Sequence, residues 1–321
     1  MNQNATLTMK QNKISKFGLE SKLKALWKYR TLALMLLPGL ILVGLFCYGP
    51  IYGLQIAFKD YKISEGIWGS PWAGLKHFEN FFMVPGSMKA IQNTVIISIY
   101  KLAFGFPAPI LFALILNEVK GGFFKRFVQT VSYLPHFISW VILGGIIYNL
   151  LSPTSGIVGG ISQMMGVNAP LILTDPRWFR TILISSSVWQ EVGWGAVVYL
   201  AAISGINAEM YESAVIDGAN RIQRMIYITV PSIAPTIITL LILRMSSILN
   251  AGFDQVFNLY NPSVLPVADI IDTYVYRVGL IGMQYSFNTA IGFFKSVVGL
   301  IMVLAVNHIV KKVSNNEMSI L

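Results

Sequence analysis

The sequence has few charged residues. Of its 321 residues, only 12% are Asp, Glu, Lys or Arg, while 55% are hydrophobic. A soluble globular domain carries about 25% charged residues, so water is not the main solvent of this chain. The net charge is +10, and seven of the 24 basic residues lie in the first 30 positions, directly before an apolar run. This placement favours an anionic membrane surface over nucleic acid as the partner of these basic residues.

Several kinds of reactive site are also missing from the sequence. The single cysteine, Cys47, excludes a disulfide framework or a cysteine-based metal site within one chain. The three histidines do not have the spacing of metal ligands, and there is neither a G-x-S-x-G elbow nor a phosphate-binding GxxxxGK[ST] loop. We therefore expect no catalytic residue, metal or cofactor in this chain, and any nucleotide to be bound by a partner.

The sequence is rich in long apolar runs. A helix of about 20 mainly apolar residues crosses a bilayer, and six segments reach this length, at 32–58, 90–116, 127–150, 179–203, 232–253 and 286–310. The first run is too long, and too rich in Leu, Gly and Pro, for a cleaved signal segment. The sequence therefore predicts an all-α integral membrane protein with six transmembrane helices.

The distribution of lysine and arginine predicts how these helices are oriented. With the N-terminus inside, the cytoplasmic segments carry 14 basic residues and the opposite segments carry six, although the first outer loop alone holds four lysines. Both termini are thus predicted to be cytoplasmic. The prediction divides the chain into a basic N-terminus at 1–31, a first transmembrane helix at 32–58, an extracytoplasmic loop at 59–89, a five-helix core at 90–310 with a cytoplasmic loop at 204–231, and a cytoplasmic tail at 311–321.

The loop at 204–231 has the pattern of two short helices joined at a glycine. Asn207 is a good N-cap, and Glu209 falls in the positive first turn of the helix that follows. Gly218 stands where a left-handed residue ends a helix, and a second helical stretch continues to Pro231. A helix lying among lipid headgroups is the alternative, but such a helix turns basic rather than acidic residues toward the lipid. The pattern favours a rigid docking surface.

The segment ESAVIDGANRIQRMIYITVPSIAP resembles the signature of the membrane subunits of binding-protein-dependent ABC importers, the MetI-like superfamily. That signature reads Glu-Ala-Ala, then Asp-Gly-Ala, then Ile-x-Leu-Pro. Ser213 and Val230 are mild departures from it that keep the helix-glycine-helix geometry. In the family this loop is the coupling helix, which sits in a groove of the cytoplasmic ATPase. The resemblance thus implies an ATPase-coupling role for Tyr211, Glu212, Ala214, Asp217, Gly218, Ala219 and Arg221.

Other segments extend the resemblance over nearly the whole chain. WQEVGWGAVVYLAAISGI, GFDQVFNLYNP and AIGFFKSVV are similar to the polysaccharide and oligosaccharide branch of these permeases. The implied fold is a five-helix importer core preceded by one N-terminal helix, in a bacterial cytoplasmic membrane. The implied partners are a second homologous permease subunit, two cytoplasmic ABC ATPase subunits that hold ATP and Mg, an extracytoplasmic solute-binding protein, a sugar and membrane lipid.

Ionisable residues also occur inside the predicted spans, at Lys101, Glu191, Arg244 and Lys295. Exposed to lipid at mid-depth, each would cost about 2.5–3.5 kcal/mol on insertion scales, so each should face protein or a water-filled interior. Tryptophans and an amide accompany Glu191, and a sugar ring can stack on an indole while its hydroxyl groups bond to polar side chains. The predicted substrate pathway comprises Trp189, Gln190, Glu191, Trp194, Arg244 and Lys295.

Pairing of Glu191 with Arg244 or Lys295, purely to neutralise buried charge, is a compatible alternative. Three basic residues against one acid in the spans favour an anionic substrate, such as a pectin- or alginate-derived oligosaccharide.

The sequence therefore predicts the permease subunit of an ATP-driven importer of an oligosaccharide or polysaccharide fragment, with no covalent chemistry of its own. The first alternative is another solute of the same importer class, such as a short neutral oligosaccharide or a glycerol-phosphate-type compound. The second is an ion-coupled secondary transporter that uses Glu191, but the six spans lack the inverted repeats that such a protein would show. A membrane-embedded enzyme or assembly factor would need a reactive constellation that the sequence does not contain.

Overall fold

The computed structural model describes residues 28–119 and 121–313. Within these two ranges the regular elements are all helices, and the extended pairing they contain is an isolated antiparallel bridge between Lys59 and Trp72. The predicted all-α class is therefore confirmed. The predicted N-terminus and tail are described only at 28–31 and 311–313, so most of both segments lies outside the described residues.

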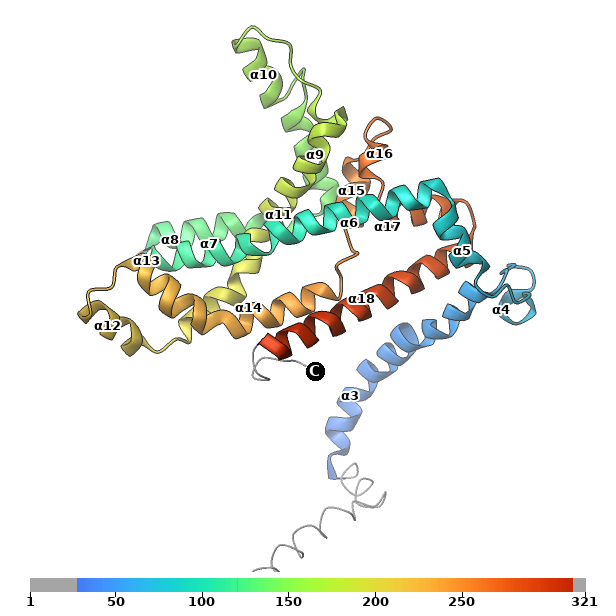
Figure 1. Cartoon of the computed structure of the whole chain (residues 1–321), viewed down its shortest axis with the longest axis horizontal. Coiled ribbons are helices and arrows are strands. Elements are labelled where there is room, and N and C mark those ends of the chain that lie inside the picture. The colour runs from blue at the N-terminus through green and yellow to red at the C-terminus, as the bar shows by residue number, and fades with distance from the viewer. Residues whose placement is uncertain (1–27, 120, 314–321) are drawn as a thin grey trace, which may run out of the picture.

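The described chain begins with one long apolar helix. Helix α3 (Arg30–Val43) continues through a π-helical turn, η1 (Gly44–Tyr48), into a 3₁₀ segment, η2 (Gly49–Phe58). Figure 1 shows α3 diverging from the other helices, and its apolar side chains are exposed. A membrane-spanning helix can expose such side chains because lipid is its solvent. Helices α4 (Gly66–Gly69) and α5 (Lys76–Met83) follow.

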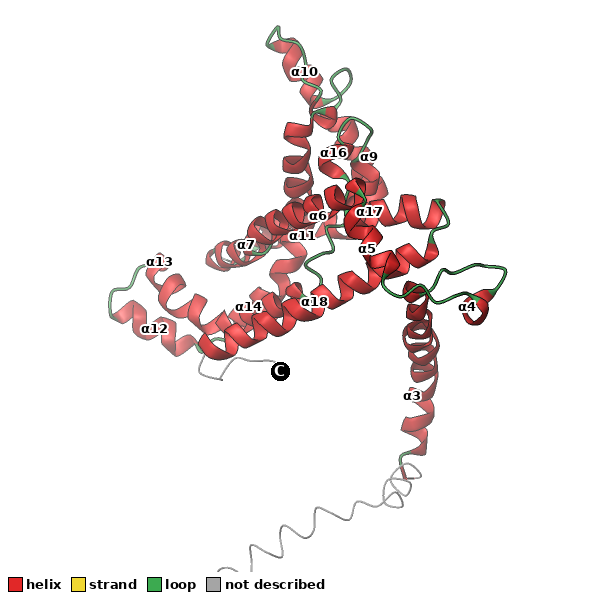
Figure 2. Ribbon diagram, turned by 45° about the vertical axis from the view of Figure 1, so that its right-hand side comes forward, coloured by secondary structure: helices red, strands yellow, loops and turns green. Residues whose placement is uncertain are grey.

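Long helices running along the longest axis form the body of the molecule, as Figures 1 and 2 show. They are α6 (Pro85–Gly105) with α7 (Pro107–Glu118), α14 (Val230–Met245) and α18 (Tyr285–Val313). Helix α11 (Pro176–Ser204) passes among them and contacts α6, α7 and α14. Helix α11 is therefore the central element against which the others pack.

The predicted third span, a continuous helix over 127–150, is wrong in its geometry. Helix α8 (Phe123–Tyr133) and the 3₁₀ turn η3 (Leu134–Phe137) are followed by α9 (Trp140–Leu151) at an angle of 107°. The backbone is extended at residues 138 and 139, shortly after Pro135, which lacks the N–H that would continue a helix. Helix α10 (Ile157–Met164) and the turn η4 (Ile172–Thr174) complete this part, and α9 and α10 project from one side of the body in Figure 1.

Four described helical stretches are long and apolar enough to cross a membrane: Arg30–Phe58, Pro85–Glu118, Arg221–Met245 and Tyr285–Lys312. The bent pair α8–α9 gives a fifth if it counts as one span. Helix α11 contains the predicted span 179–203 and has the length, but serines, Gln190 and Glu191 reduce its apolarity. The predicted span 232–253 extends too far, because α14 ends at Met245 and a serine- and glycine-containing loop follows.

The remaining helices of the described chain are short. Helices α12 (Ala208–Ile216) and α13 (Arg221–Arg224) lie at one end, and a π-helical turn, η5 (Met225–Thr229), joins α13 to α14. Between α14 and α18 come α15 (Phe253–Leu259), α16 (Leu265–Ala268), α17 (Ile271–Val275) and the π-helical turn η6 (Tyr276–Ile281). Helices α4, α5 and α17 lie at the end away from α12 in Figure 1.

Three buried apolar clusters hold these helices together. The first joins α6, α9, α11 and α15 and includes Ile97, Phe179 and Val256. The second joins α5, α6, α17 and α18 around Phe81, and the third joins α7, α11 and α14 around Tyr199. Each cluster contains side chains from segments far apart in the sequence, so the described bundle folds as one packed body.

Helix α11 also comes into very close contact with α8. A Cβ atom added at Gly193 would lie 2.0 Å from the carbonyl oxygen and 2.4 Å from the carbonyl carbon of Ser132. The obstruction is main chain, so no change of side-chain rotamer would relieve it. Glycine is therefore required at this crossing.

Candidate functional site

The loop at 204–231 has the predicted helix-glycine-helix form. The side chain of Asn207 accepts a hydrogen bond of 3.1 Å from the backbone N–H of Glu209 and caps α12. Gly218 has a φ of +81°, the left-handed conformation predicted for it. The second helix begins at Arg221 after an N-cap at Asn220. The Asn220 side-chain oxygen accepts from the Gln223 N–H, and the Asn220 N–H donates to the Gln223 side-chain oxygen, which is a capping box. The prediction for this loop is confirmed in its local geometry.

The hydrogen bonds at the C-terminal end of α12 explain the positions of two small residues of the loop, Ala214 and Ala219. The Ala219 N–H donates to the Ala214 carbonyl at 2.8 Å, and the Gly218 N–H donates to the Val215 carbonyl at 3.1 Å. This pair of bonds is the Schellman motif, which closes a helix when the residue after its end is left-handed. Ala214 and Ala219 are thus the first and last residues of this motif. Both residues are half-buried and serve the shape of the loop.

The other residues expected to act in coupling divide into an inward and an outward group. The Tyr211 hydroxyl lies 2.8 Å from the Thr229 hydroxyl, which connects α12 to the π-helical turn at the base of α14. Glu212, Asp217 and Arg221 are exposed, and the ion pairs found among residues 28–119 and 121–313 do not involve them. The same loop also exposes apolar side chains at Ile216, Ile222 and Tyr227.

The structure does not bring the six predicted pathway residues together. Trp189 lines a groove between α6–α7 and α11, whose volume is about 1,000 Å³. Gln190 is buried on another side of α11, where its amide donates to the Ile138 carbonyl at 3.3 Å. This bond satisfies a backbone oxygen freed by the break between η3 and α9. Gln190 thus supports the break and is absent from the groove that Trp189 lines.

Glu191 and Trp194 lie together at the same break. A Glu191 carboxylate oxygen lies 3.4 Å from Nδ1 of His136, and the His136 ring stacks on Trp194 with centroids 5.0 Å apart. Phe137 meets Trp194 edge-on at 5.3 Å. The compatible alternative, in which Glu191 pairs with Arg244 or Lys295, is wrong because the carboxylate lies beside His136 instead. His136 was not among the predicted pathway residues, because a lone histidine in an apolar run gives no local signal of its partner.

Arg244 and Lys295 border the loop that follows α14. Lys295 pairs with Asp272 at 2.5 Å, and both line a small polar pocket of about 290 Å³ with Asn250. Arg244 lines a neighbouring crevice that also includes Lys101 and Asn250. The residues of the predicted pathway are therefore divided among separate sites along the bundle.

Lys101 is buried by packing among neutral acceptors. Its ammonium donates to the Ala251 carbonyl at 2.7 Å and to the side-chain oxygen of Gln255. The Gln255 amide in turn donates to the Leu183 carbonyl at 2.6 Å and to the Ser186 hydroxyl at 2.8 Å. These bonds join α6, α11 and the start of α15. Lys101 therefore holds helices together.

Comparison with known proteins identifies the family. The family described as binding-protein-dependent transport system inner membrane component matches residues 105–315. The chain belongs to this family. It is 44% identical over 281 residues to the polygalacturonan/rhamnogalacturonan transport system permease protein YteP of Bacillus subtilis (strain 168), with 88% of each chain covered.

Two solved structures resemble this permease closely. One is a bacterial ABC transporter involved in the import of the acidic polysaccharide alginate, with a TM-score of 0.85 and 44% identity over 92% of this chain and 99% of that one. The other is a bacterial alginate ABC transporter in complex with alginate pentasaccharide-bound periplasmic protein, with a TM-score of 0.84 and 43% identity over the same shares. The resemblance found in the sequence, to permease subunits of the polysaccharide and oligosaccharide branch, is confirmed.

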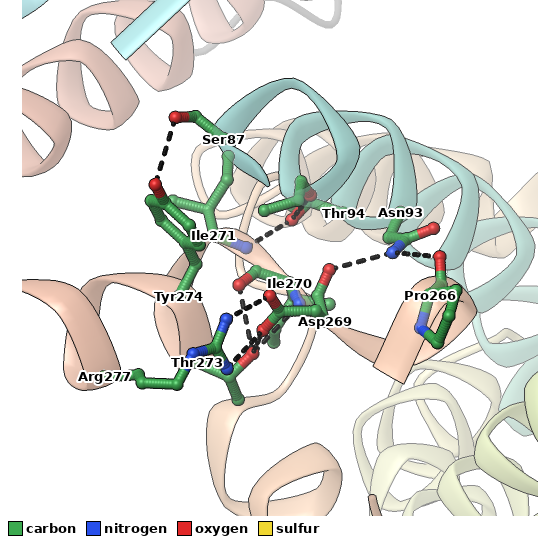
Figure 3. Close-up of polar contacts among 11 residues, drawn as sticks. Ser87, Asn93, Thr94, Pro266, Asp269, Ile270, Ile271, Thr273, Tyr274 and Arg277 are labelled. Carbon is green, nitrogen blue, oxygen red and sulfur yellow. Dashed lines mark hydrogen bonds and ion pairs between the residues drawn. The ribbon is translucent and has the colours of Figure 1, made fainter. Parts of the chain in front are cut away.

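A polar network that the sequence analysis missed fixes the segment after α15 onto α6 of the permease (Figure 3). The Asn93 amide donates to the carbonyls of Pro266 at 3.1 Å and Asp269 at 3.0 Å. The Thr94 hydroxyl accepts from the Ile271 N–H at 2.8 Å, and the Asp269 carboxylate pairs with Arg277 at 2.5 Å. The signal was available, because polar residues such as Asn93 and Thr94 inside an apolar run need partners.

The loop at 59–89 has its own charged cluster. Asp60 lies 2.9 Å from the Lys76 ammonium and 3.1 Å from Nε2 of His77. The hydrogen bond from Lys76 holds the pKa of the Asp60 carboxyl below its usual range. Phe58 stacks on Trp72 beside this cluster, at 5.8 Å. The loop is thus a folded unit and not a bare connection.

Proposed function

We propose that this chain is the transmembrane permease subunit of an ATP-driven, binding-protein-dependent importer of an acidic oligosaccharide or polysaccharide fragment. The observation that carries the proposal is the match to the alginate transporter over nearly the whole of both chains. YteP, whose name gives polygalacturonan and rhamnogalacturonan, supports the same class, since both polymers contain uronic acids. The assignment to acidic sugars therefore rests on two relatives that handle carboxylated polymers.

The proposed topology has six spans with both termini in the cytoplasm of a bacterial cell. In this arrangement the bent pair α8–α9 serves as the third span, and α11 serves as the fourth although it is less apolar than the others. A polar central helix is tolerated when neighbouring helices surround it, and α11 is packed against α6, α7 and α14. The proposed division of the chain remains an outer loop at 59–89 and a five-helix core at 90–310 that contains the segment 204–231, here called the coupling loop.

The proposed partners are a second homologous permease subunit, two ATPase subunits that bind ATP and Mg, and an extracytoplasmic solute-binding protein. Support for the binding protein comes from the alginate transporter described in complex with its loaded periplasmic protein. Support for an ATPase comes from the coupling loop, whose exposed side chains include both charged and apolar residues. Glu212, Asp217 and Arg221 form no ion pair within residues 28–119 and 121–313. No nucleic acid and no cofactor of its own enter the proposal.

The proposed mechanism depends on the contact between Tyr211 and Thr229 and on the groove that Trp189 lines. Movement of the ATPase would displace α12, and the Tyr211–Thr229 contact would pass this displacement to the base of α14. Sugar would pass α11 on the side of Trp189, with Glu191, Trp194, Arg244 and Lys295 at other polar sites of the bundle. Gln190 would contribute by holding the break at Ile138.

The proposal is tested by affinity purification of the chain from its native membrane, followed by uptake in proteoliposomes. We expect an ATPase, a second permease and a binding protein to co-purify, and the reconstituted complex to take up radiolabelled oligogalacturonides or alginate oligosaccharides only with ATP. Uptake driven by an ion gradient without ATP, by the chain alone, would overturn the proposal.

Replacing Tyr211 with phenylalanine is expected to weaken coupling without removing the ATPase. The variant loses the hydroxyl contact with Thr229, and a neutral hydrogen bond contributes about 0.5–1.5 kcal/mol. Uptake per ATP hydrolysed should fall about two- to ten-fold, measured in proteoliposomes with equal amounts of ATPase. Tyr148→Phe is the matched control, because Tyr148 is exposed and lies in α9, outside this loop; equal effects of both changes would contradict the role of Tyr211.

Replacing Trp189 with alanine is expected to raise the KM for sugar uptake about ten-fold, because an indole face supplies a large contact surface to a sugar ring. Trp189→Phe should raise the KM less than Trp189→Ala does, because phenylalanine keeps an aromatic face. Trp178 offers a control on the same helix, since it is exposed in the first turn of α11 and does not line the groove. A Trp189→Ala variant with unchanged KM would remove Trp189 from the pathway.

A further inference from the structure

The groove beside Trp189 contains one charged lining residue. It is formed by Tyr100, Phe104 and Leu111 on the α6–α7 side and by residues 180–189 of α11 on the other, and Arg180 is its one charged residue. At about 100° per residue, Thr181, Ile184, Ser185 and Val188 point from α11 into the middle of the groove, and Arg180 and Trp189 lie at its two edges. A cation therefore faces an otherwise uncharged concave surface.

Neutral groups hold the Arg180 side chain in position. Its Nη2 donates to the side-chain oxygen of Asn93 at 2.9 Å, and its Nε donates to the Val267 carbonyl at 3.3 Å. Asn93 is itself buried and fixed by its two bonds to the segment after α15. Both acceptors of Arg180 are neutral, and the ion pairs among residues 28–119 and 121–313 do not include this guanidinium.

This arrangement orients the guanidinium and leaves its charge uncompensated. A guanidinium has five N–H donors in a planar fork, and the two described bonds use only part of them. A half-buried cation with spare donors is complementary to a carboxylate, which binds the fork more strongly than a neutral oxygen does. The hydroxyl groups of Thr181 and Ser185 on the same face suit the hydroxyl groups of a sugar.

We propose that Arg180 is a specificity-determining residue of the pathway, which binds the carboxylate of a uronic-acid unit as the sugar passes along the groove. Arg180 and Trp189 are nine residues apart, or about 13.5 Å along the helix axis, which is longer than one sugar ring. A carboxylate at Arg180 and a ring at Trp189 therefore belong to different units of one oligomer. The inference rests on the proposed function and extends it to the recognition of charge.

The test uses the complete complex in proteoliposomes with its binding protein and a pair of substrates, trigalacturonate and its carboxyl-reduced neutral counterpart. For each substrate, uptake by the variant is divided by uptake by the wild type, so that the preference of the binding protein cancels. Arg180→Gln is expected to lower uptake of the acidic trimer about ten-fold or more and to change uptake of the neutral trimer less than about two-fold. Arg180→Lys keeps the charge and should retain more acidic uptake than Arg180→Gln.

Arg177→Gln is the matched control, because Arg177 lies one turn away, is exposed and pairs with Asp175 at 2.7 Å. It should leave both uptake ratios unchanged. A second readout is equilibrium binding of both trimers to the purified complex in nanodiscs without binding protein, where only the acidic trimer should lose affinity in Arg180→Gln.

Equal changes for both substrates, or identical behaviour of the Gln and Lys variants, would overturn the inference and leave Arg180 as a structural residue that anchors Asn93. A wild-type complex with no ATP-dependent uptake of either trimer, or of an alginate trimer, would instead overturn the proposed function.

Discussion

Replacing Gly218 with valine is expected to lower ATP-driven uptake at least about ten-fold in a chain that still folds and inserts. Gly218 has a φ of +81°, and a Cβ atom there would meet no other atom within 4 Å. The cost is therefore one of backbone conformation alone, about 1–2 kcal/mol for an ordinary residue and more for a β-branched one. The Schellman bonds of Gly218 and Ala219 would open, and the exposed face of α12 would lose its fixed direction.

Gly218→Asn is the control, because asparagine tolerates the left-handed region. It should retain most of the uptake that Gly218→Val loses, while the two variants are recovered from the membrane in equal amounts. The measurement is uptake in proteoliposomes together with the amount of ATPase that co-purifies. Normal uptake by the valine variant would show that the left-handed turn is unnecessary for coupling.

Replacing Gly193 with alanine is expected to disrupt the fold itself. The new methyl group would be placed 2.0 Å from the carbonyl oxygen of Ser132, so α8 and α11 would have to separate. Overpacking a core costs about 1–3 kcal/mol and occasionally more, and a collision with main chain belongs at the upper end. We expect a large fall in the Tm of the detergent-solubilised protein and in the yield of monodisperse material.

Gly292→Ala provides the comparison in α18, where an added Cβ meets no atom within 4 Å. Alanine has the higher helix propensity by about 1 kcal/mol, so this control should keep or slightly raise the Tm. If both substitutions left the Tm unchanged, the close crossing of α8 and α11 would be contradicted.

The coupling loop was predictable from the sequence because its signals are local. Asn207 caps a helix and Gly218 ends it, and each acts within a few residues of its own position. The break at Ile138 was not predicted, because an apolar run indicates that a segment lies in a membrane and does not indicate its direction. Pro135 was the available signal, and the bond from Gln190 that satisfies the break comes from another helix.

The polar residues of the bundle could be identified from the sequence, but the residues with which they pair could not. Lys295 was identified as a charge within a span, yet its partner Asp272 lies between the predicted spans 232–253 and 286–310. Arg180 is one residue inside the predicted start of its span, so the sequence analysis did not count it among the charges in the membrane. Which charges face each other depends on how helices far apart in the sequence pack, and no local pattern contains that information.

The π-helical turn Met225–Thr229 contains one residue more than a regular α-helical turn would hold. Deleting a single residue there would turn the i→i+5 bonds of this wide turn into regular i→i+4 bonds. Because the wide turn already takes up the extra residue, α13 would keep nearly its present direction around the axis of α14, whereas a deletion within the regular part of α14 would rotate it by about 100°. The turn between α13 and α14 is thus a place where the chain can change its length by one residue and still present the same side of α12 and α13.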